Sequence, residues 1–468
     1  MKFKFAILFS LFSLLLQADS LSVFSLEDFL NIVKQNHPVA KQADLQKRMG
    51  EAQLLKNKGL FDPYIYSQLS QKNFNNKNYY SINENGVEMP TRIGVKLKAA
   101  YDVSEGVFLN PENSTSVNGL LSSGVSVPLL QGLFTDQRRT ALKQARLYQD
   151  ATVYERQLML NNLVFDAINA YLEWALSYNQ LLVYKDVLDL AQIRFDGVKS
   201  SYLFGDRAEI DTVEAFIQYQ TRKADYFQAQ QNYAKNSIYL SEFLWTERLT
   251  PLQLASSTYP ASFSALEEKI VIKQDSLERI ITNLPYTQPA IKISNYKVQF
   301  LKAERLLKIE KIKPKLDVDY NFLTESVTPN YSQLLNYNSN NYKWGFSFSF
   351  PLLVREARGD LNFTKAKMQD ADYDYTFKIV EYTNKVKSYY VEFVNASNQV
   401  GFYKNIAANQ FRLLNAEKSN FDSGEGSIFM INIREQNLLS ARLKLVEQQI
   451  KYEKAYYSIY WSAGLLAL

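Results

Sequence analysis

Apolar and polar residues alternate along two short stretches of the chain and recur at helical spacing along much longer ones. In 345–350, phenylalanine alternates with serine. In 315–323 the apolar positions are Leu316, Val318, Tyr320 and Phe322, and the polar positions between them are Asp317, Asp319 and Asn321. Such alternation predicts strands with one apolar and one wet face, either in a membrane-spanning wall or in a half-buried soluble sheet. Carboxylates at every second position favour the wall.

The same order of elements occurs twice in the chain. Pro38 and Pro63 stand 25 residues apart in the first half, and Pro289 and Pro314 also stand 25 apart in the second. A helix-like stretch lies between each pair, a strand follows each second proline, and another strand in each half ends in Pro-Leu-Leu. Long helical runs follow both. The pattern predicts a duplicated module of helix, strand, strand and long helices.

The boundaries of the two predicted repeats follow from these elements. The first repeat covers 19–245, with strands at about 64–72 and 120–128 and long helices at about 136–196 and 206–245. A linker over 246–285, with a short helix at 266–281, leads to the second repeat, 286–468. That repeat has strands at about 315–323 and 342–350, a loop at 324–341, and long helices at about 359–421 and 427–461.

A polar segment, 72–115, separates the first two predicted strands and is rich in Asn, Tyr and Ser. It holds one more strand-like piece, 93–101. A single additional crossing would leave the following chain on the wrong side of a membrane, so that the two repeats would no longer match. We therefore expect 93–101 to belong to an extracellular extension, which leaves four membrane strands per chain.

The first residues predict export. Lys2 and Lys4 precede an apolar stretch at 6–16, and Ala18 provides a small residue at a cleavage site, so that 1–18 is predicted to be a signal peptide. Its removal lowers the net charge from +5 to +3, which is too small to indicate a nucleic-acid partner. No later run of 18 apolar residues predicts a helical membrane span.

The residues for most catalytic chemistry are missing from the sequence. There is no cysteine, and the single histidine, His37, stands beside Pro38. This composition excludes a metal site built from several histidines, and it excludes disulfides. A Ser-His-Asp arrangement away from His37 is also excluded, and no phosphate-binding glycine-rich loop occurs. We expect no enzyme, no cofactor and no metal site.

Four strands cannot close a membrane barrel alone, because an open sheet edge in lipid leaves backbone groups unpaired. The chain is therefore expected to share its strands with copies of itself. Three copies in a ring would give 12 strands and would close every edge. The same ring would gather the long helices into a second, helical barrel.

The duplicated layout, the prolines before the strands, the Pro-Leu-Leu strand ends and the glycine-containing helix turns together resemble the TolC-like outer-membrane efflux proteins, or outer membrane factors. The resemblance implies a mainly α fold with transmembrane β-strands: a homotrimer with a shared 12-stranded β-barrel in the lipid of the outer membrane and a long periplasmic α-helical barrel. It also implies a passive export duct of a tripartite efflux or type I secretion system, in a Gram-negative type of envelope. A periplasmic adaptor and an inner-membrane transporter would be its partners.

The most specific part of the resemblance is the motif Gly-x5-Asp-x3-Ala, which runs from Gly205 through Asp211 to Ala215. In the second copy it begins at Gly426, where the resemblance implies Asn432 at the position of Asp211. By the same resemblance, the narrow periplasmic mouth is formed by Asp211, Glu214, Asn432 and Glu435. The turns that would contact the adaptor contain Gly205, Asp206, Arg207, Gly424, Gly426 and Ser427.

The second copy departs from the family pattern. Asn432 is uncharged, and Ile428 stands where the best-known member has a basic residue of its closing latch. Arg207 and Arg434 are the candidates to replace that residue. Acids near these turns would also be explained by the preference of Asp and Glu for the first turn of a helix.

Two functional alternatives remain at this stage. One is a periplasmic or surface-attached coiled-coil protein with a structural or adhesive role, in which the strands form a small soluble sheet. The other retains the duct and leaves open whether it exports drugs, metals or proteins. The sequence identifies neither the exported substrate nor the adaptor.

Overall fold

The computed structural model of the chain describes residues 22–255, 257–261, 272–325 and 340–466. The expected signal peptide, the first part of the expected helix 266–281 and most of the loop 324–341 lie outside these ranges. The chain divides into two compact units. Unit 1 comprises Met1–Lys41, Met159–Ile281 and Asn384–Leu468, and unit 2 comprises Gln42–Leu158 and Thr282–Thr383.

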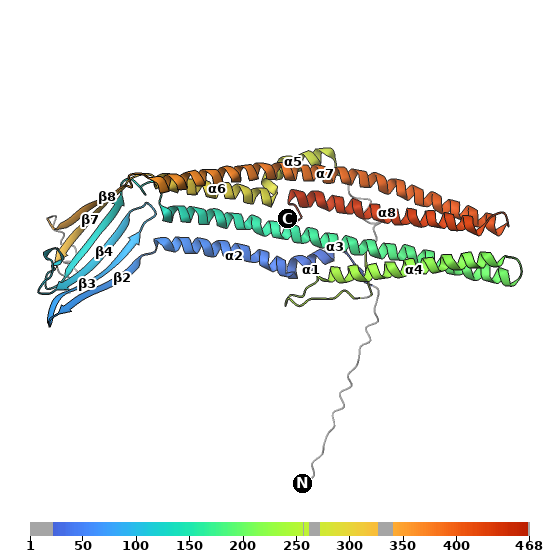
Figure 1. Ribbon diagram of the computed structural model, residues 1–468, viewed down its shortest axis with the longest axis horizontal. Coiled ribbons are helices and arrows are strands. Elements are labelled where there is room, and N and C mark those ends of the chain that lie inside the picture. Colours follow the sequence, from blue (N-terminus) through green and yellow to red (C-terminus); the bar gives the residue numbers. More distant parts are fainter. Residues whose placement is uncertain (1–21, 256, 262–271, 326–339, 467–468) are drawn as a thin grey trace, which may run out of the picture. The chain divides into compact units, whose positions relative to one another are not determined.

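Unit 2 is built on a six-stranded antiparallel sheet with the order β2-β3-β4-β5-β7-β8 (Figure 1). Its strands are β2 (Tyr64–Phe74), β3 (Lys77–Pro90), β4 (Lys96–Glu105), β5 (Leu120–Pro128), β7 (Lys315–Glu325) and β8 (Tyr342–Ser349). Strand β5 from the first repeat pairs with β7 from the second. The two halves of the chain are therefore joined inside one sheet.

The expectation of four strands per chain is wrong for this sheet, because β3 and β4 occupy the segment expected to be an extension. They form one complete hairpin between β2 and β5. Two crossings restore the direction of the chain, so the objection to a single additional strand does not apply to a pair. The alternation in β3 is interrupted by Asn83 and Asn85, which concealed the strand in the sequence.

Each side of the six-stranded sheet has its own chemistry. Directly paired residues of neighbouring strands point to the same face, so the register defines rows that cross the sheet. One row is apolar and contains Met89, Leu97, Val125, Tyr320 and Trp344. A row on the opposite face contains Tyr64, Glu88, Lys98, Gly124, Asn321 and Lys343. The two faces predicted from the alternation in 315–323 thus continue onto the neighbouring strands at this level of the sheet.

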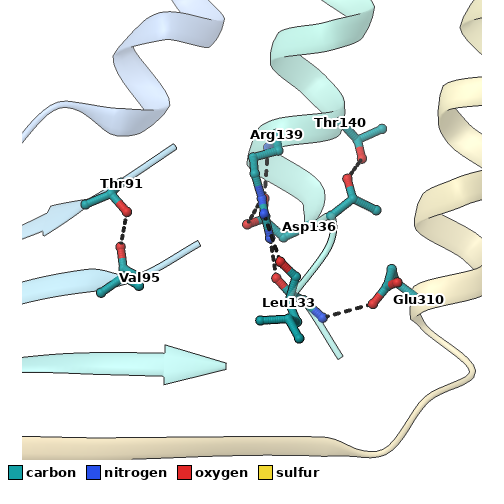
Figure 2. Close-up of polar contacts among 9 residues, drawn as sticks. Thr91, Val95, Leu133, Asp136, Arg139, Thr140 and Glu310 are labelled. Carbon is teal, nitrogen blue, oxygen red and sulfur yellow. Dashed lines mark hydrogen bonds and ion pairs between the residues drawn. The ribbon is translucent and has the colours of Figure 1, made fainter. Parts of the chain in front are cut away.

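A set of polar contacts fixes the junction between β5 and the helix α3 (Gln137–Leu203), as Figure 2 shows. Arg139 pairs with the carboxylate of Asp136 at 3.0 Å and donates to the backbone carbonyls of Gly132 and Leu133. The backbone N–H of Gly132 donates to Glu310 Oε2 at 3.4 Å. Because buried backbone groups need partners, these contacts set the path of the chain from strand to helix.

The other helices of unit 2 lie at the ends of the strands. Helix α2 (Pro38–Lys58) leads through the short η1 (Gly59–Phe61) into β2, and α6 (Pro289–Glu310) leads into β7. Pro38 and Pro289 each occupy the first residue of their helix, where the missing N–H costs nothing. A second short turn, η2 (Pro111–Asn113), lies between β4 and β5.

Unit 1 is mainly helical and receives the C-terminal parts of the two longest helices, α3 and α7 (Arg355–Asp422). The further elements are α1 (Leu26–Asn36), α4 (Glu209–Ser241), α5 (Gln274–Thr287, shared with unit 2), α8 (Ile428–Ala463), and β1 (Ser22–Phe24) paired in parallel with β6 (Thr258–Pro260). The helices expected at 136–196 and 359–421 correspond to α3 and α7. No helix in the described ranges is both long and apolar enough to cross a membrane.

Aromatic side chains form the core of unit 1. Trp174 is fully buried and its Nε1–H donates to Ser237 Oγ at 3.1 Å. Tyr171 donates its hydroxyl proton to the carbonyl of Phe24 at 2.7 Å. Burial raises the pKa of Tyr171 to about 12, so the hydroxyl keeps the proton that it donates. Helix α3 is thereby tied both to α4 and to the β1 segment.

A glycine contact between the two halves of the sheet gives a stability prediction. A Cβ at Gly124 would lie 2.3 Å from the backbone oxygen of Tyr320, whereas a Cβ at Gly345 would meet nothing within 4 Å. We expect Gly124→Ala to destabilise the sheet by about 1–3 kcal/mol through overpacking, and Gly345→Ala to have little effect. Denaturant unfolding of the two variants in detergent measures the difference, and equal stabilities would contradict the β5–β7 register.

Candidate functional site

Two tight turns join the long helices of unit 1. In the α3–α4 turn Gly205 has φ of +84°, and the N–H of Asp206 donates to the carbonyl of Ser201 at 3.0 Å. In the α7–α8 turn Gly424 has φ of +81°, and the N–H of Glu425 donates to the carbonyl of Asn420 at 2.9 Å. Both helices therefore end in the left-handed glycine cap that satisfies their last carbonyl groups.

The backbone matches Gly205 with Gly424, and not with Gly426 as the sequence motif does. Three residues after each left-handed glycine stands the N-cap of the next helix, Ala208 in one turn and Ser427 in the other. Gly426 serves another purpose, because a Cβ there would lie 2.8 Å from the backbone N of Phe421. The motif pairing is thus displaced by two positions, since two closely spaced glycines with different roles look alike in a sequence.

The turns expose both polar and apolar groups. Of the residues expected to contact an adaptor, Gly205, Asp206, Gly424 and Ser427 are exposed, while Gly426 and Arg207 are half-buried. The Arg207 guanidinium lies 4.0 Å from the centre of the Phe421 ring, which ties the first turn to the end of α7 by a cation–π contact. Three large side chains beside the turns are strongly exposed: Leu203, Phe204 and Phe429.

Three of the four residues expected at the mouth lie close to Arg194, a residue that was not predicted from the sequence. The Arg194 guanidinium on α3 donates to Asn432 Oδ1 at 3.0 Å and forms an ion pair with Glu435, both on α8. The amide of Asn432 then donates to Glu214 Oε1 on α4 at 2.9 Å. We call Arg194, Glu214, Asn432 and Glu435 the Arg194 network. Asp211, partly exposed on the first turn of α4, lies outside it.

The α8 residues of the Arg194 network are buried, Arg194 and Glu214 are partly buried, and the charge of Glu435 is compensated by Arg194. Asn432 and Glu435 are only 7% and 5% exposed. Burial, together with the nearby Arg222, lowers the pKa of Arg194 to about 10, so the guanidinium remains charged at neutral pH. Burial and Arg194 also lower the pKa of Lys418 on α7. The charge of Glu435 is therefore neutralised within the chain, in contrast to that of Asp211.

A second polar contact between the hairpins lies next to the Arg194 network. Arg222 on α4 is 5% exposed and donates to Gln436 Oε1 on α8 at 2.7 Å. It also pairs with Asp225 at 3.4 Å. The partly buried Arg194 and the buried Arg222 thus connect the α3–α4 hairpin to α8. Within the described ranges, no group of three or more His, Asp or Glu side chains is placed to hold a metal ion.

The candidates for a substitute latch residue are placed differently from Arg194. Arg434 lies 3.9 Å from Glu417 on α7, and Arg207 stacks on Phe421, so neither contacts the mouth residues through a charge pair that the structure shows. A sequence signal for Arg194 does exist. It follows the buried Val187 and Ala191 and precedes the buried Val198 at helical spacing, and a cation on an apolar stripe needs a buried partner.

Removal of Arg194 gives a prediction with a matched control. Arg194→Ala leaves the Glu435 carboxylate buried without its partner, which we expect to cost about 3–5 kcal/mol. Arg442→Ala removes a more exposed pair, Arg442 with Asp186 at 3.7 Å, at an expected cost of about 0–1 kcal/mol. Denaturant unfolding followed by the helical circular-dichroism signal measures the free energy of unfolding of both variants. An Arg194→Ala variant as stable as Arg442→Ala would contradict a paired buried charge.

Comparisons with known proteins show the fold. No model of a known protein family and no curated protein sequence matches the chain. Among solved structures, it resembles the CmeC outer membrane channel of Campylobacter jejuni, with a TM-score of 0.66 and 13% identity over 94% of this chain and 85% of the other.

Two further structures give the same result. The outer membrane protein VceC of Vibrio cholerae has a TM-score of 0.66 and 12% identity, over 94% of this chain and 96% of the other. The open state of the MtrE outer membrane channel of Neisseria gonorrhoeae also has 0.66, with 13% identity over 94% of this chain and 88% of the other. The chain therefore has the fold of these outer-membrane channels, as its resemblance to the TolC-like proteins predicts.

Proposed function

We propose that this chain is the outer-membrane channel-tunnel of a tripartite efflux or type I secretion system. Three copies form a passive export duct through the outer membrane and across the periplasm. The duct has no chemistry of its own, and the energy for transport comes from an inner-membrane transporter reached through a periplasmic adaptor. The observation that carries this proposal is the exposed apolar face of the six-stranded sheet.

That apolar face has the chemistry of a lipid contact. Ile65, Phe346 and Trp344 are 84%, 66% and 60% exposed in the single chain. Soluble proteins rarely expose an apolar surface of this extent. The coiled-coil alternative would place the face in water with nothing to cover it. A membrane covers the face and leaves the opposite, charged face to line an aqueous lumen.

The open edges of the sheet support the association of several copies. Among the described residues, strands β2 and β8 each pair with a single neighbouring strand, so each presents an open edge, a row of backbone groups, in that part of the chain. In lipid, every unpaired group costs several kcal/mol. Pairing the β8 edge of one copy with the β2 edge of the next satisfies both rows, and a closed ring leaves no edge.

The turn end of unit 1 supplies the periplasmic mouth in this proposal. Asp211, Glu214, Asn432 and Glu435 form the constriction, and the exposed residues of the two turns contact the adaptor. Phe204 and Phe429 beside these turns are exposed to water, and an adaptor that covered these rings would gain free energy from their burial. Opening separates α8 from the α3–α4 hairpin, and the Arg194 network with the Arg222–Gln436 bond holds the mouth closed until the partners supply the energy.

The number of chains in the extracted protein tests the assembly. We expect that detergent is needed to release the protein from membranes and that light scattering after size-exclusion chromatography gives three chains per particle. The same particles should form ion-conducting pores in planar lipid bilayers. A protein released without detergent as a monomer would contradict the proposal.

The two acids Asp211 and Glu435 should affect the pore in different ways. Uncompensated carboxylates at a narrow mouth favour cations, so Asp211→Asn should lower the cation preference in reversal-potential measurements with little change in stability. Glu435→Gln instead weakens the Arg194 network and should raise the fraction of time spent open. If Asp211→Asn leaves ion selectivity unchanged, the residue does not line the constriction.

A further inference from the structure

We propose that the β3–β4 hairpin crosses the outer membrane together with the other four strands, so that each chain contributes six strands and three copies close an 18-stranded barrel. This inference rests on the proposed function, because it assumes that the sheet lies in the outer membrane. It differs from the 12-stranded barrel that the resemblance implies.

A tight turn at the outer end of the sheet leads from β2 into the β3–β4 hairpin. Asn75 and Asn76, between β2 and β3, have φ of +50° and +58°. Two residues in this conformation form the turn that matches the twist of paired strands. Strands β2 and β3 are then paired over the whole length of β2, from Tyr64 with Glu88 to Phe74 with Lys77. Strand β3 therefore returns over the full height of its neighbour.

The inner end of the hairpin lies at the helix side of the sheet. The turn between β3 and β4 is closed by Thr91, whose N–H donates to the Val95 carbonyl at 2.9 Å. The Thr91 hydroxyl donates to the same carbonyl at 2.7 Å (Figure 2). Gly94 in this turn has φ of +95°, and a Cβ there would lie 2.9 Å from Arg139 Nη2. The turn thus packs against the junction that leads from β5 to α3, and an extension beyond the outer strand ends could not reach this position.

The faces of the hairpin continue the faces of the wall. Its apolar residues Val87 and Met89 on β3 and Leu97 on β4 are 36–40% exposed and lie in the apolar rows. Its charged residues Glu88 and Lys98 lie in the polar row on the opposite face. A hairpin outside the membrane would have no need to keep an apolar face in register with the membrane strands.

Six strands also allow the ring to close. Because all neighbours are antiparallel and their number is even, the edge strands β2 and β8 run in opposite directions. The β8 edge of one copy can therefore form an antiparallel pair with the β2 edge of the next, and the apolar faces remain outside. Since barrel diameter grows roughly linearly with strand number, 18 strands give a lumen about half again as wide as 12.

The position of the inner turn provides the test, and the chain has no cysteine that would interfere with labelling. Three single-cysteine variants are compared in intact and in permeabilised cells, with a maleimide on a polymer too bulky to pass a barrel. Arg92→Cys reports the β3–β4 turn. Val117→Cys reports the opposite end of the sheet, in the loop before β5, and Leu60→Cys reports the helix side of β2; both native side chains are exposed, by 102% and 41%.

We expect Val117→Cys to be labelled in intact cells, and Arg92→Cys and Leu60→Cys to be labelled only after permeabilisation. If Arg92→Cys is labelled together with Val117→Cys while Leu60→Cys is protected, the hairpin is an extracellular extension and the inference is overturned, although the proposed function stands. If Val117→Cys is protected in intact cells, the membrane orientation fails, and the proposed function fails with it.

Discussion

Pairing of backbone groups is the constraint on which the rest of the molecule depends. A sheet with one apolar and exposed face is suited to lipid, but lipid offers no hydrogen-bond partner to the edges of β2 and β8. In the proposed assembly, these edges are satisfied by copies of the same chain. A closed ring of copies would also gather the long helices α3 and α7, so that one requirement accounts for both the wall and the helical part of the proposed duct.

The same requirement explains why strands are added in pairs. One more strand would reverse the direction of the chain and place the following helix on the opposite side of the membrane. A hairpin such as β3–β4 leaves the direction unchanged and preserves which residues face lipid, because side chains alternate with a period of two. A proposed barrel can therefore gain strands as hairpins without changing the side of the membrane on which α3 and α7 begin.

Near the two turns of unit 1, some polar side chains contact one another within the chain, whereas others are free to act on a proposed pore. Glu435 and Asn432 are buried against Arg194, so the acid that a motif would assign to the pore acts mainly on packing between α3 and α8. Asp211 has no such compensation in the described chain and is the better candidate for an effect on permeating ions. In the proposed duct, closing the mouth and selecting ions therefore depend on different residues.

The sequence predicted the elements with strong periodicity and missed those set by local turns. The alternation around Val318 and the helical spacing of apolar residues over 136–196 identified a strand and a long helix, because burial on one face leaves a regular pattern. Strand β3 was missed because Asn83 and Asn85 weaken its alternation, although the pair Asn75-Asn76 is itself a hairpin signal.

The same distinction holds at the candidate site. Glu214, Asn432 and Glu435 were named from the motif, and the structure brings them together. Arg194 was missed because its partners lie more than two hundred residues away along the chain. The motif could not distinguish Gly424 from Gly426 either, since φ is not visible in a sequence. Contacts between distant helices and backbone conformation at paired glycines are set by packing.

The most direct test of the account is a count of strands around the assembled protein in lipid, by electron cryomicroscopy at a resolution that separates neighbouring strands. We expect three chains around one axis, with six strands from each and β2 of one chain beside β8 of the next. A ring with four strands per chain would contradict the widened barrel, and a particle without a closed ring would contradict the channel itself.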